Sequence, residues 1–179
     1  MKQTNGGGET CIRAATAADA RRVRAIERAA QRLFLDSPHP ECADLDPIPR
    51  DRLRWQAESG WLYVAVDPDD RPAGFIACSV IDGDVFVEEV DVLPSHAGRR
   101  IGARLLDTVA AAARARGIRR VVLTTFADVP WNAPYYERLG FRPLSEPEWG
   151  PELVERVEEE DESGLDRAAR VCLVRSVAP

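Results

Sequence analysis

The segment 61–93 most restricts what this chain can fold into, because it holds three short apolar runs separated by two turn sequences. The runs are WLYVAV (61–66), GFIACSVI (74–81) and VFVEEVDVL (85–93), with DPDDRP and DGD between them. Apolar runs of this length, bounded by aspartate, glycine and proline, are typical of strands joined as hairpins. The segment therefore predicts an antiparallel meander, which needs further elements to cover it.

Helical and strand patterns alternate on both sides of this meander. Residues 11–16 predict an edge strand, 18–35 a helix with apolar side chains at helical spacing, and 50–58 a short helix after a proline-rich loop. After the meander come a helix to Ala115, a strand (119–126), a short helix (132–140), a strand (141–144), an acidic helix and a last strand (170–177). This order predicts an α/β fold of the α+β type, with a mixed, mostly antiparallel central sheet and helices on both faces.

Length and composition limit the function classes. The 179 residues predict one domain over 10–179 after a short flexible tail over 1–9. We expect a cytoplasmic protein that binds no membrane, because no apolar run reaches about 20 residues and the N-terminus has no signal core. Four scattered cysteines and two histidines predict no metal site.

Charge is unevenly distributed along the chain. A net charge of −6 without a continuous basic face argues against nucleic acid binding. From Glu146 to Asp166 there are ten acids and one base, Arg156. This run is either a solvated helix or a rim that attracts a cationic substrate.

The loop after the third run is a candidate anion site. HAGRRIGARLL places Gly98 and Gly102 around a helix start, with Arg99 and Arg100 between them. Free amides at a helix start carry about half a positive charge, and arginines pair with phosphate oxygens. A connection that uses glycine only for its turn explains the loop as well. Walker and dinucleotide motifs are excluded, because no Lys or Ser/Thr follows Gly102 and the preceding strand is antiparallel.

The chain resembles the GNAT superfamily of acyl-CoA-dependent N-acetyltransferases at two motifs. EEVDVLP (88–94), with its loop and helix, matches the central motif, and PYYERLGF (134–141) matches the tyrosine-bearing helix that follows. The loop departs from the family pattern, since Ala97 replaces the usual Gln or Arg and Arg100 replaces a glycine. The resemblance implies acetyl-CoA as co-substrate, with its pantetheine arm between strands 85–93 and 119–126.

The resemblance also implies which residues bind the cofactor. The strand would hold the arm and polarise the thioester through the amides of Val90, Asp91 and Val92. The phosphates would lie on the loop and helix start, formed by Gly98, Arg99, Arg100, Ile101, Gly102 and Ala103. Asn132 is interpreted first as a helix cap and second as a cofactor contact, because the family's asparagine lies where this chain has Val129.

Two residues match the family's base and acid. Glu88 matches the general base of similar polyamine acetyltransferases, and strand alternation places it on the face of Val90 and Val92, with Glu89 and Asp91 on the other. The alternative is a solvated glutamate. Tyr136 aligns with the tyrosine that protonates the departing thiolate, and the alternative is a buried aromatic with a bonded hydroxyl.

Together these patterns predict an acyltransferase that moves an acetyl group from acetyl-CoA to a primary amine by direct attack. The expected acceptor is a small cationic metabolite. Two alternatives are left open: a protein acetyltransferase acting on lysine or an N-terminal amine, and a non-catalytic domain that binds or senses acyl-CoA. A homodimer through the last strand is also left open.

Overall fold

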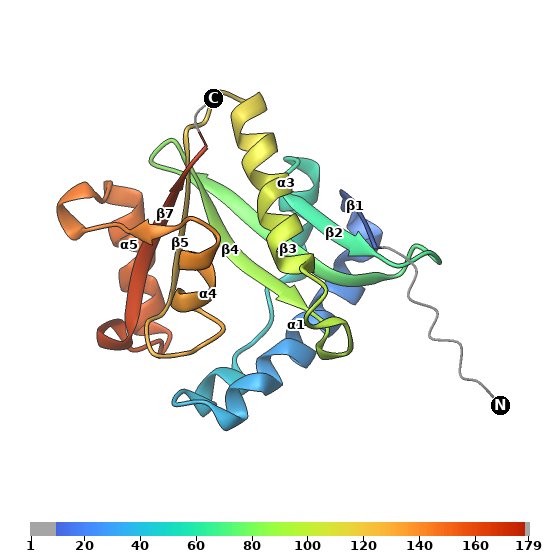
Figure 1. Cartoon of the computed structure of the whole chain (residues 1–179), viewed down its shortest axis with the longest axis horizontal. Coiled ribbons are helices and arrows are strands. Elements are labelled where there is room, and N and C mark those ends of the chain that lie inside the picture. Colours follow the sequence, from blue (N-terminus) through green and yellow to red (C-terminus); the bar gives the residue numbers. More distant parts are fainter. Residues whose placement is uncertain (1–9, 178–179) are drawn as a thin grey trace.

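The computed structural model describes residues 10–177, and the predicted tail over 1–9 lies outside them. Within the described residues, seven strands form one sheet in the order β1-β2-β3-β4-β5-β7-β6 (Figure 1). Of the strand pairs in this part of the chain, β4–β5 alone is parallel. The strands are β1 (Cys11–Ala14), β2 (Leu62–Val66), β3 (Pro72–Ile81), β4 (Asp84–Val92), β5 (Arg120–Phe126), β6 (Arg142–Pro143) and β7 (Arg170–Ser176). The predicted mixed sheet is confirmed.

Helices cover both faces of this sheet, as predicted. They are α1 (Ala20–Gln31), α2 (Arg50–Glu58), α3 (Ile101–Ala115), α4 (Ala133–Arg138) and α5 (Pro151–Glu162). α3 and α4 pack on one face, and α1, α2 and α5 pack on the other. Among residues 10–177, no helix combines the length and the apolar character that crossing a bilayer requires.

The connection from α1 to α2 is more structured than its sequence predicts. The helix expected over 18–35 is an α-helix to Gln31 and continues as the 3₁₀-helix η2 (Arg32–Asp36). The proline-rich stretch forms a second 3₁₀-helix, η3 (Pro40–Asp44), with Pro40 in its first turn. These two short helices pack together and lie beside the carboxyl end of β5.

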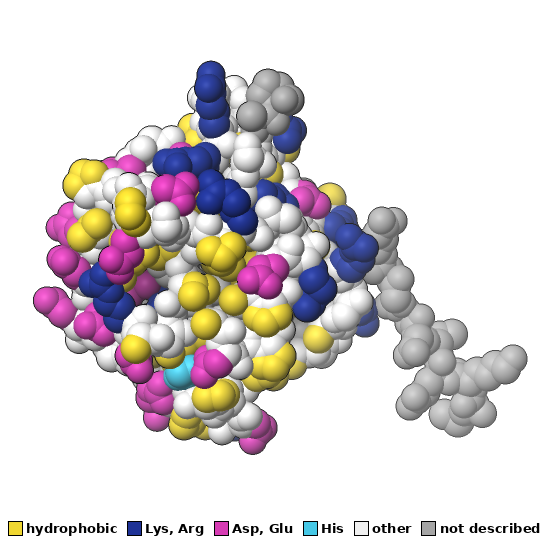
Figure 2. Space-filling view, turned by 60° about the vertical axis from the view of Figure 1, so that its left-hand side comes forward, with side chains coloured by type: hydrophobic (Ala, Val, Ile, Leu, Met, Phe, Trp, Pro, Cys, Tyr) yellow, Lys and Arg dark blue, Asp and Glu magenta, His cyan; other side chains and the backbone are white. Residues whose placement is uncertain are grey.

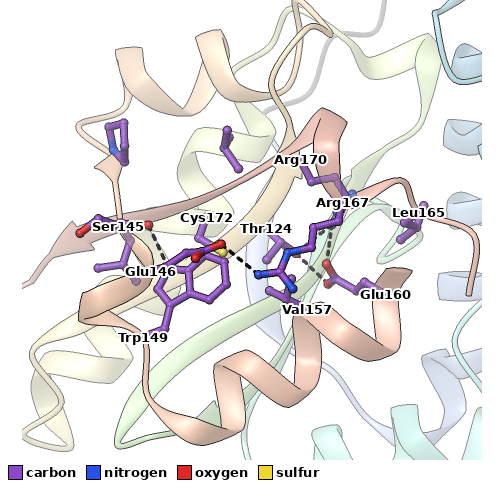
Figure 3. Close-up of a pocket in the computed structure, with 13 residues that line it drawn as sticks. Thr124, Ser145, Glu146, Trp149, Val157, Glu160, Leu165, Arg167, Arg170 and Cys172 are labelled. Carbon is purple, nitrogen blue, oxygen red and sulfur yellow. Dashed lines mark hydrogen bonds and ion pairs between the residues drawn. The ribbon is translucent and has the colours of Figure 1, made fainter. Parts of the chain in front are cut away.

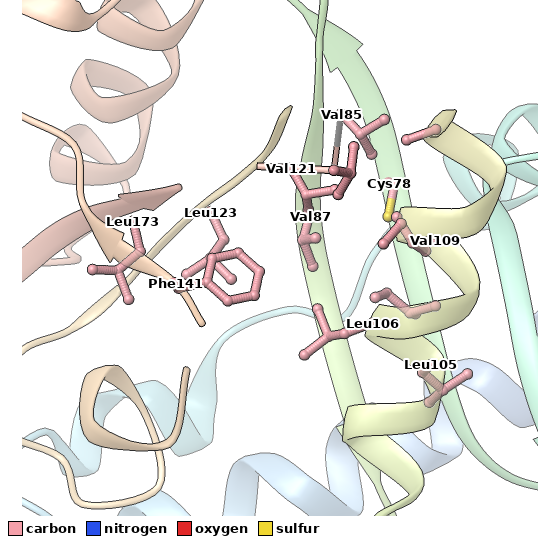
Figure 4. Close-up of a cluster of buried hydrophobic side chains, with 14 of the residues drawn as sticks. Cys78, Val85, Val87, Leu105, Leu106, Val109, Val121, Leu123, Phe141 and Leu173 are labelled. Carbon is pink, nitrogen blue, oxygen red and sulfur yellow. The ribbon is translucent and has the colours of Figure 1, made fainter. Parts of the chain in front are cut away.

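The main core lies between α3 and the centre of the sheet (Figure 4). Leu105, Leu106 and Val109 are fully buried, and they face Val85 and Val87 of β4. Burial of a leucine side chain of this kind stabilises a fold by about 1.5–3 kcal/mol. This packing holds the start of α3 against the middle of β4, where the two strands of the parallel pair begin to separate.

β4 and β5 pair only over three residues and then diverge (Figure 1). The parallel ladder covers Val85–Val87 on β4, whereas β5 stays paired with β7 as far as Phe126. On the other side of β4, the register with β3 shifts so that Glu88 has no partner. This β-bulge bends β4 away from β5 and opens the sheet at its centre.

The bulge also changes which face each β4 side chain occupies. Val85 and Val87 face α3, and so do Val90 and Val92, although strict alternation from Val87 would point Glu89 there. Glu88 lies on the opposite face, where it contacts α2. The predicted position of Glu88 on the face of Val90 and Val92 is therefore wrong, because one extra residue reverses the alternation.

Candidate active site

A cavity of about 510 Å³ lies where β4 and β5 separate. One wall is β4 from Val87 to Val92, and the opposite wall is β5 from Leu123 to Phe126. The loop before α3 closes one end, η2 and η3 line another side, and α4 contributes its aromatic residues. The bulge in β4 thus lies in one wall of this cavity, and the walls include residues from both sequence motifs.

The loop before α3 presents open backbone amides to this cavity. Within residues 10–177, the amides from Gly98 to Gly102 donate to no acceptor. Gly98 has a φ of 76°, and Arg100, the N-cap residue of α3, has a φ of 58°, so both adopt the left-handed conformation. These turns aim successive amides outward at a helix start, which is an arrangement suited to phosphate.

The predicted cradle residues divide into two groups. Gly98, Arg100, Ile101 and Gly102 line the cavity, whereas Arg99 and Ala103 do not. In the part of the chain that the structure describes, neither Arg99 nor Arg100 forms an ion pair. Both guanidinium groups are therefore available to an anion at the loop.

The edge of β4 that faces β5 is open beyond the bulge. Val90, Asp91 and Val92 line the cavity and pair on the other side with β3. Because β5 has already turned away, backbone groups on this edge have no neighbouring strand. An extended ligand chain could lie along this edge and bond to it as an added strand does.

Glu88 is held by α2. Its carboxylate accepts hydrogen bonds from Arg52 and from Gln56, with Gln56 Nε2 3.0 Å from Oε2. Arg52 also forms an ion pair with the same carboxylate. Both partners belong to α2, far from β4 in the sequence. Arg52 and Gln56 together occupy both oxygens of the Glu88 carboxylate.

Three further carboxyl groups lie close together on this side of the sheet, namely Glu89 and Asp91 of β4 and Glu27 of α1. Burial, with the Glu89 charge nearby, raises the pKa of Glu27 on α1 to about 8. Burial also raises the pKa of Glu89 to about 7, and burial with the Glu89 and Glu27 charges raises that of Asp91 well above its ordinary value. Within residues 10–177, none of the three forms an ion pair. Of the four carboxyl groups that line the cavity, Glu88 and Glu160 are paired with arginines, and Glu89 and Asp91 form no ion pair within residues 10–177.

Tyr136 lies on α4 with its ring against Tyr135 and Phe141, at centroid distances of 5.5 Å and 5.7 Å. Burial, then the charges of Glu89 and Asp91, raise the pKa of Tyr136 above its ordinary value. Its hydroxyl forms no hydrogen bond within the described residues, and the side chain lines the cavity. A phenol that stays protonated and unbonded can donate a proton to a bound group.

The sequence did not single out Tyr135 for the site. Its hydroxyl lies over the start of α3, where a Cβ on Gly102 would come within 3.0 Å of it. A side chain at position 102 would therefore press on the Tyr135 hydroxyl, which would have to shift. Asn132 stands at the N-cap of α4 as predicted, but its side chain does not bond to the helix amides and lines the cavity.

An aromatic cluster joins η2 and η3 to the end of β5. Phe34 lies 6.1 Å from Trp131 and 5.9 Å from Phe126, and His39 stacks on Phe126 at 4.0 Å. His39 Nε2 also lies 2.9 Å from Asp128 Oδ1. These contacts hold the short helices over one side of the cavity. Hydrophobic side chains gather at the centre of one face of the molecule, with acidic ones to its left (Figure 2).

A smaller cavity of about 260 Å³ lies beyond β7, against α5 (Figure 3). Thr124, Glu160 and Arg170 line both cavities and separate them. Arg170 Nη2 donates to Thr124 Oγ1 at 2.8 Å and to Glu160 Oε2 at 3.0 Å, and Thr124 Oγ1 donates to Glu160 at 2.7 Å. Within residues 10–177, no cluster of three or more His, Cys, Asp or Glu side chains could hold a metal ion.

Solved structures share this architecture at low sequence identity. PaiA N-acetyltransferase from Thermoplasma acidophilum, in complex with coenzyme A, gives a TM-score of 0.68 at 14% identity over 94% of this chain and 99% of that one. The ribosomal-protein-S18-alanine N-acetyltransferase from Escherichia coli gives 0.64 at 15% identity over 95% of each chain.

A larger protein contains the same fold as one part. N-acetylglutamate synthase from Neisseria gonorrhoeae, complexed with coenzyme A and N-acetyl-glutamate, gives a TM-score of 0.70 at 19% identity over 94% of this chain but 35% of that one. These identities establish a common fold. Residues 13–141 match the model of the acetyltransferase (GNAT) family, a stretch that contains the splayed strands, the cradle and Tyr136. The chain belongs to the acetyltransferase (GNAT) family and is an acyltransferase.

Proposed function

We propose that this protein transfers an acetyl group from acetyl-CoA to the primary amine of a small cationic metabolite. One observation carries the proposal: the cavity between β4 and β5 has open amides at one end, and along its wall lie Glu89 and Asp91, which form no ion pair within residues 10–177. The first feature suits a phosphate-bearing donor, and the second suits a positively charged acceptor. The thioester would lie between them.

The donor end fits coenzyme A. The amides from Gly98 to Gly102 would bind its phosphates, with Arg99 and Arg100 adding charge, and the open edge of β4 at Val90–Val92 would hold the arm. Asn132 faces the same space. Coenzyme A bound to PaiA N-acetyltransferase, a structure with this fold, supports this assignment.

The acceptor end favours a cation. Glu89 and Asp91 line the cavity, and burial together with neighbouring carboxyl groups, Glu27 of α1 among them, raises the pKa of both. An ammonium group that entered the cavity would relieve this repulsion and favour ionisation. Phe34 and Trp131 at the rim could contact the alkyl part of the same molecule or its cation.

The reaction needs a proton acceptor, a stabilised oxyanion and a proton donor. Amides on the open edge of β4 would polarise the thioester carbonyl. Tyr136 would give its phenolic proton to the departing thiolate. The resemblance implies that Glu88 accepts the proton that leaves the acceptor ammonium. Arg52 and Gln56 already bond to the carboxylate that would accept this proton.

Location and assembly belong to the same proposal. A cytoplasmic location is supported by four free cysteines in a chain that would use acetyl-CoA. β7 is paired with β5 along its length and with β6 at Leu173 and Val174 alone, so a homodimer would use the edge that β6 leaves free. Sedimentation velocity measures whether that dimer forms.

The test is release of free thiol from acetyl-CoA in the presence of a panel of amines. The panel contains 1,4-diaminobutane, spermidine, tyramine, lysine, and peptides with a free N-terminus or a lysine. We expect turnover with at least one small cationic amine and none with neutral alcohols. Turnover with peptides alone would replace the proposal by protein acetylation. Binding of coenzyme A without turnover of any acceptor would replace it by a binding domain.

A further inference from the structure

The two adjacent glutamates of β4 have different surroundings, although both lie on the face covered by α1 and α2. Glu88 is the extra residue of the bulge and is bonded to Arg52 and Gln56. Glu89 pairs with Ala77 across the strand, lines the cavity and, within residues 10–177, forms no ion pair or side-chain hydrogen bond with another side chain. Both glutamates line the cavity, but the carboxylate of Glu88 is bonded to α2, whereas that of Glu89 has no side-chain partner among the described residues.

We propose that Glu89, rather than Glu88, takes the proton from the acceptor ammonium. This assignment rests on the proposed amine acetyltransferase function. It follows from three observations: the carboxylate of Glu88 is occupied by a guanidinium and a side-chain amide, that of Glu89 lines the cavity and has only the Val90 backbone amide as a partner among the described residues, and Tyr136, the proposed acid, lines the same cavity. Base and acid would then face the same space between the strands.

The proton balance of the step is simple. The ammonium R–NH₃⁺ gives one proton to the Glu89 carboxylate and becomes a neutral amine. The amine nitrogen forms a bond to the thioester carbonyl carbon, and the C–S bond breaks. Tyr136 protonates the leaving thiolate. The acylated nitrogen then carries one proton too many, and it gives that proton to the Tyr136 oxygen. Glu89 then loses its proton to solvent, so one proton is released for each amide formed.

Titratable and charged groups that influence Glu89, or are influenced by it, come from α1, η3, β4, α4, α5 and β7. They are Glu27 of α1, Cys42 of η3, Glu88 and Asp91 of β4, Tyr136 of α4, Glu160 of α5 and Arg170 of β7. Burial is the largest influence and raises the pKa of Glu89 to about 7, while the hydrogen bond from the Val90 amide and then the charge of Arg170 oppose the rise. A base with a pKa near the working pH is ionised often enough to accept a proton and basic enough to keep it.

The decisive experiment compares Glu89→Gln, Glu89→Asp, Glu88→Gln and Glu155→Gln. Glu155 is an exposed acid on α5 and serves as the matched control for loss of one negative charge. For each variant, kcat/KM is measured from pH 5 to 9 with the amine of the panel that gives the highest wild-type rate. Coenzyme A affinity by calorimetry and thermal unfolding are measured in parallel, so that a folding defect is recognised.

We expect wild-type kcat/KM to rise with pH and to show an inflection near 7. Glu89→Gln should lower kcat/KM by about 100-fold or more at neutral pH. Its remaining rate should follow the fraction of free amine, without that inflection. Glu89→Asp should keep the inflection at a reduced rate. Glu88→Gln should keep the inflection too, with a smaller loss that comes from freeing Arg52, and Glu155→Gln should behave as wild type.

Two outcomes overturn the assignment while leaving the function intact. One is a Glu89→Gln enzyme that binds coenzyme A, folds, and keeps kcat/KM within about threefold of wild type. The other is loss of the inflection in Glu88→Gln and its retention in Glu89→Gln. A wild-type protein that turns over no amine refutes the function itself, and the assignment falls with it.

Discussion

Replacing Arg100 by glycine is expected to stabilise the fold. Arg100 has a φ of 58° at the N-cap of α3, and this left-handed conformation costs an L-residue about 1–2 kcal/mol. Glycine avoids that cost but loses about 0.5–1 kcal/mol more chain entropy on folding. Since the guanidinium forms no ion pair within the described residues, the net gain should be about 0.75 kcal/mol, in a range of about 0–1.5 kcal/mol.

Thermal unfolding and urea denaturation are measured for Arg100→Gly, for its control and for the wild type. A gain of this size raises Tm by about 1–4 °C for a chain of this length. The matched control is Arg99→Gly, because Arg99 is the same residue type one position earlier without a positive φ. That variant should lose about 0.5–1 kcal/mol.

Equal or lower stability of Arg100→Gly relative to Arg99→Gly would refute the reasoning. The same pair of variants separates stability from ligand binding. Each removes one positive charge from the loop, so each should weaken coenzyme A binding and reduce its dependence on salt. If Arg100→Gly is more stable but binds coenzyme A more weakly, the strained backbone at Arg100 is explained by the contribution of its side chain to binding.

Three further outcomes are expected. Tyr136→Phe should lower kcat by about 100-fold with unchanged coenzyme A affinity, and a loss smaller than threefold would remove its role as acid. Leu106→Ala, at a fully buried position, should cost about 2–5 kcal/mol of unfolding free energy in urea; a loss below 1 kcal/mol would contradict the packing. Because burial raises the folded pKa of Glu27 from 4.5 to about 8, folding favours its protonated form, and that stability is lost as pH rises through 8. Glu27→Gln should therefore gain in Tm over wild type between pH 5 and pH 9, and a constant difference would contradict the shift.

Much of the fold follows from local patterns in the sequence. The apolar runs of 61–93 became β2, β3 and β4, and the loop with Gly98 and Gly102 opens α3 as predicted. The family resemblance placed Tyr136 and the cradle at the same cavity. These features depend on spacing within one element or between neighbours, and spacing of that kind is visible in a sequence.

The bulge at Glu88 was not predictable in this way. EEVDV is compatible with regular alternation, and its reversal depends on how β3 pairs opposite it. The partners of Glu88 come from α2, 32 and 36 residues away, and no local pattern records that contact. Pairing register and distant polar contacts are properties of the packed chain, so the surroundings of each β4 acid required the structure.

The wall between the two cavities has a consequence for how the protein can change. The family match ends at residue 141, whereas Glu160 and Arg170 reach the cleft from beyond that point. The donor cradle and the part of the cavity lining formed by Glu160 and Arg170 are therefore encoded by separate stretches of sequence. Substitutions after residue 141 can reshape the space available to an acceptor while the helix start at Ile101 stays as it is. The acceptor preference of the enzyme can therefore change through substitutions in residues 142–179, without changes in the cradle.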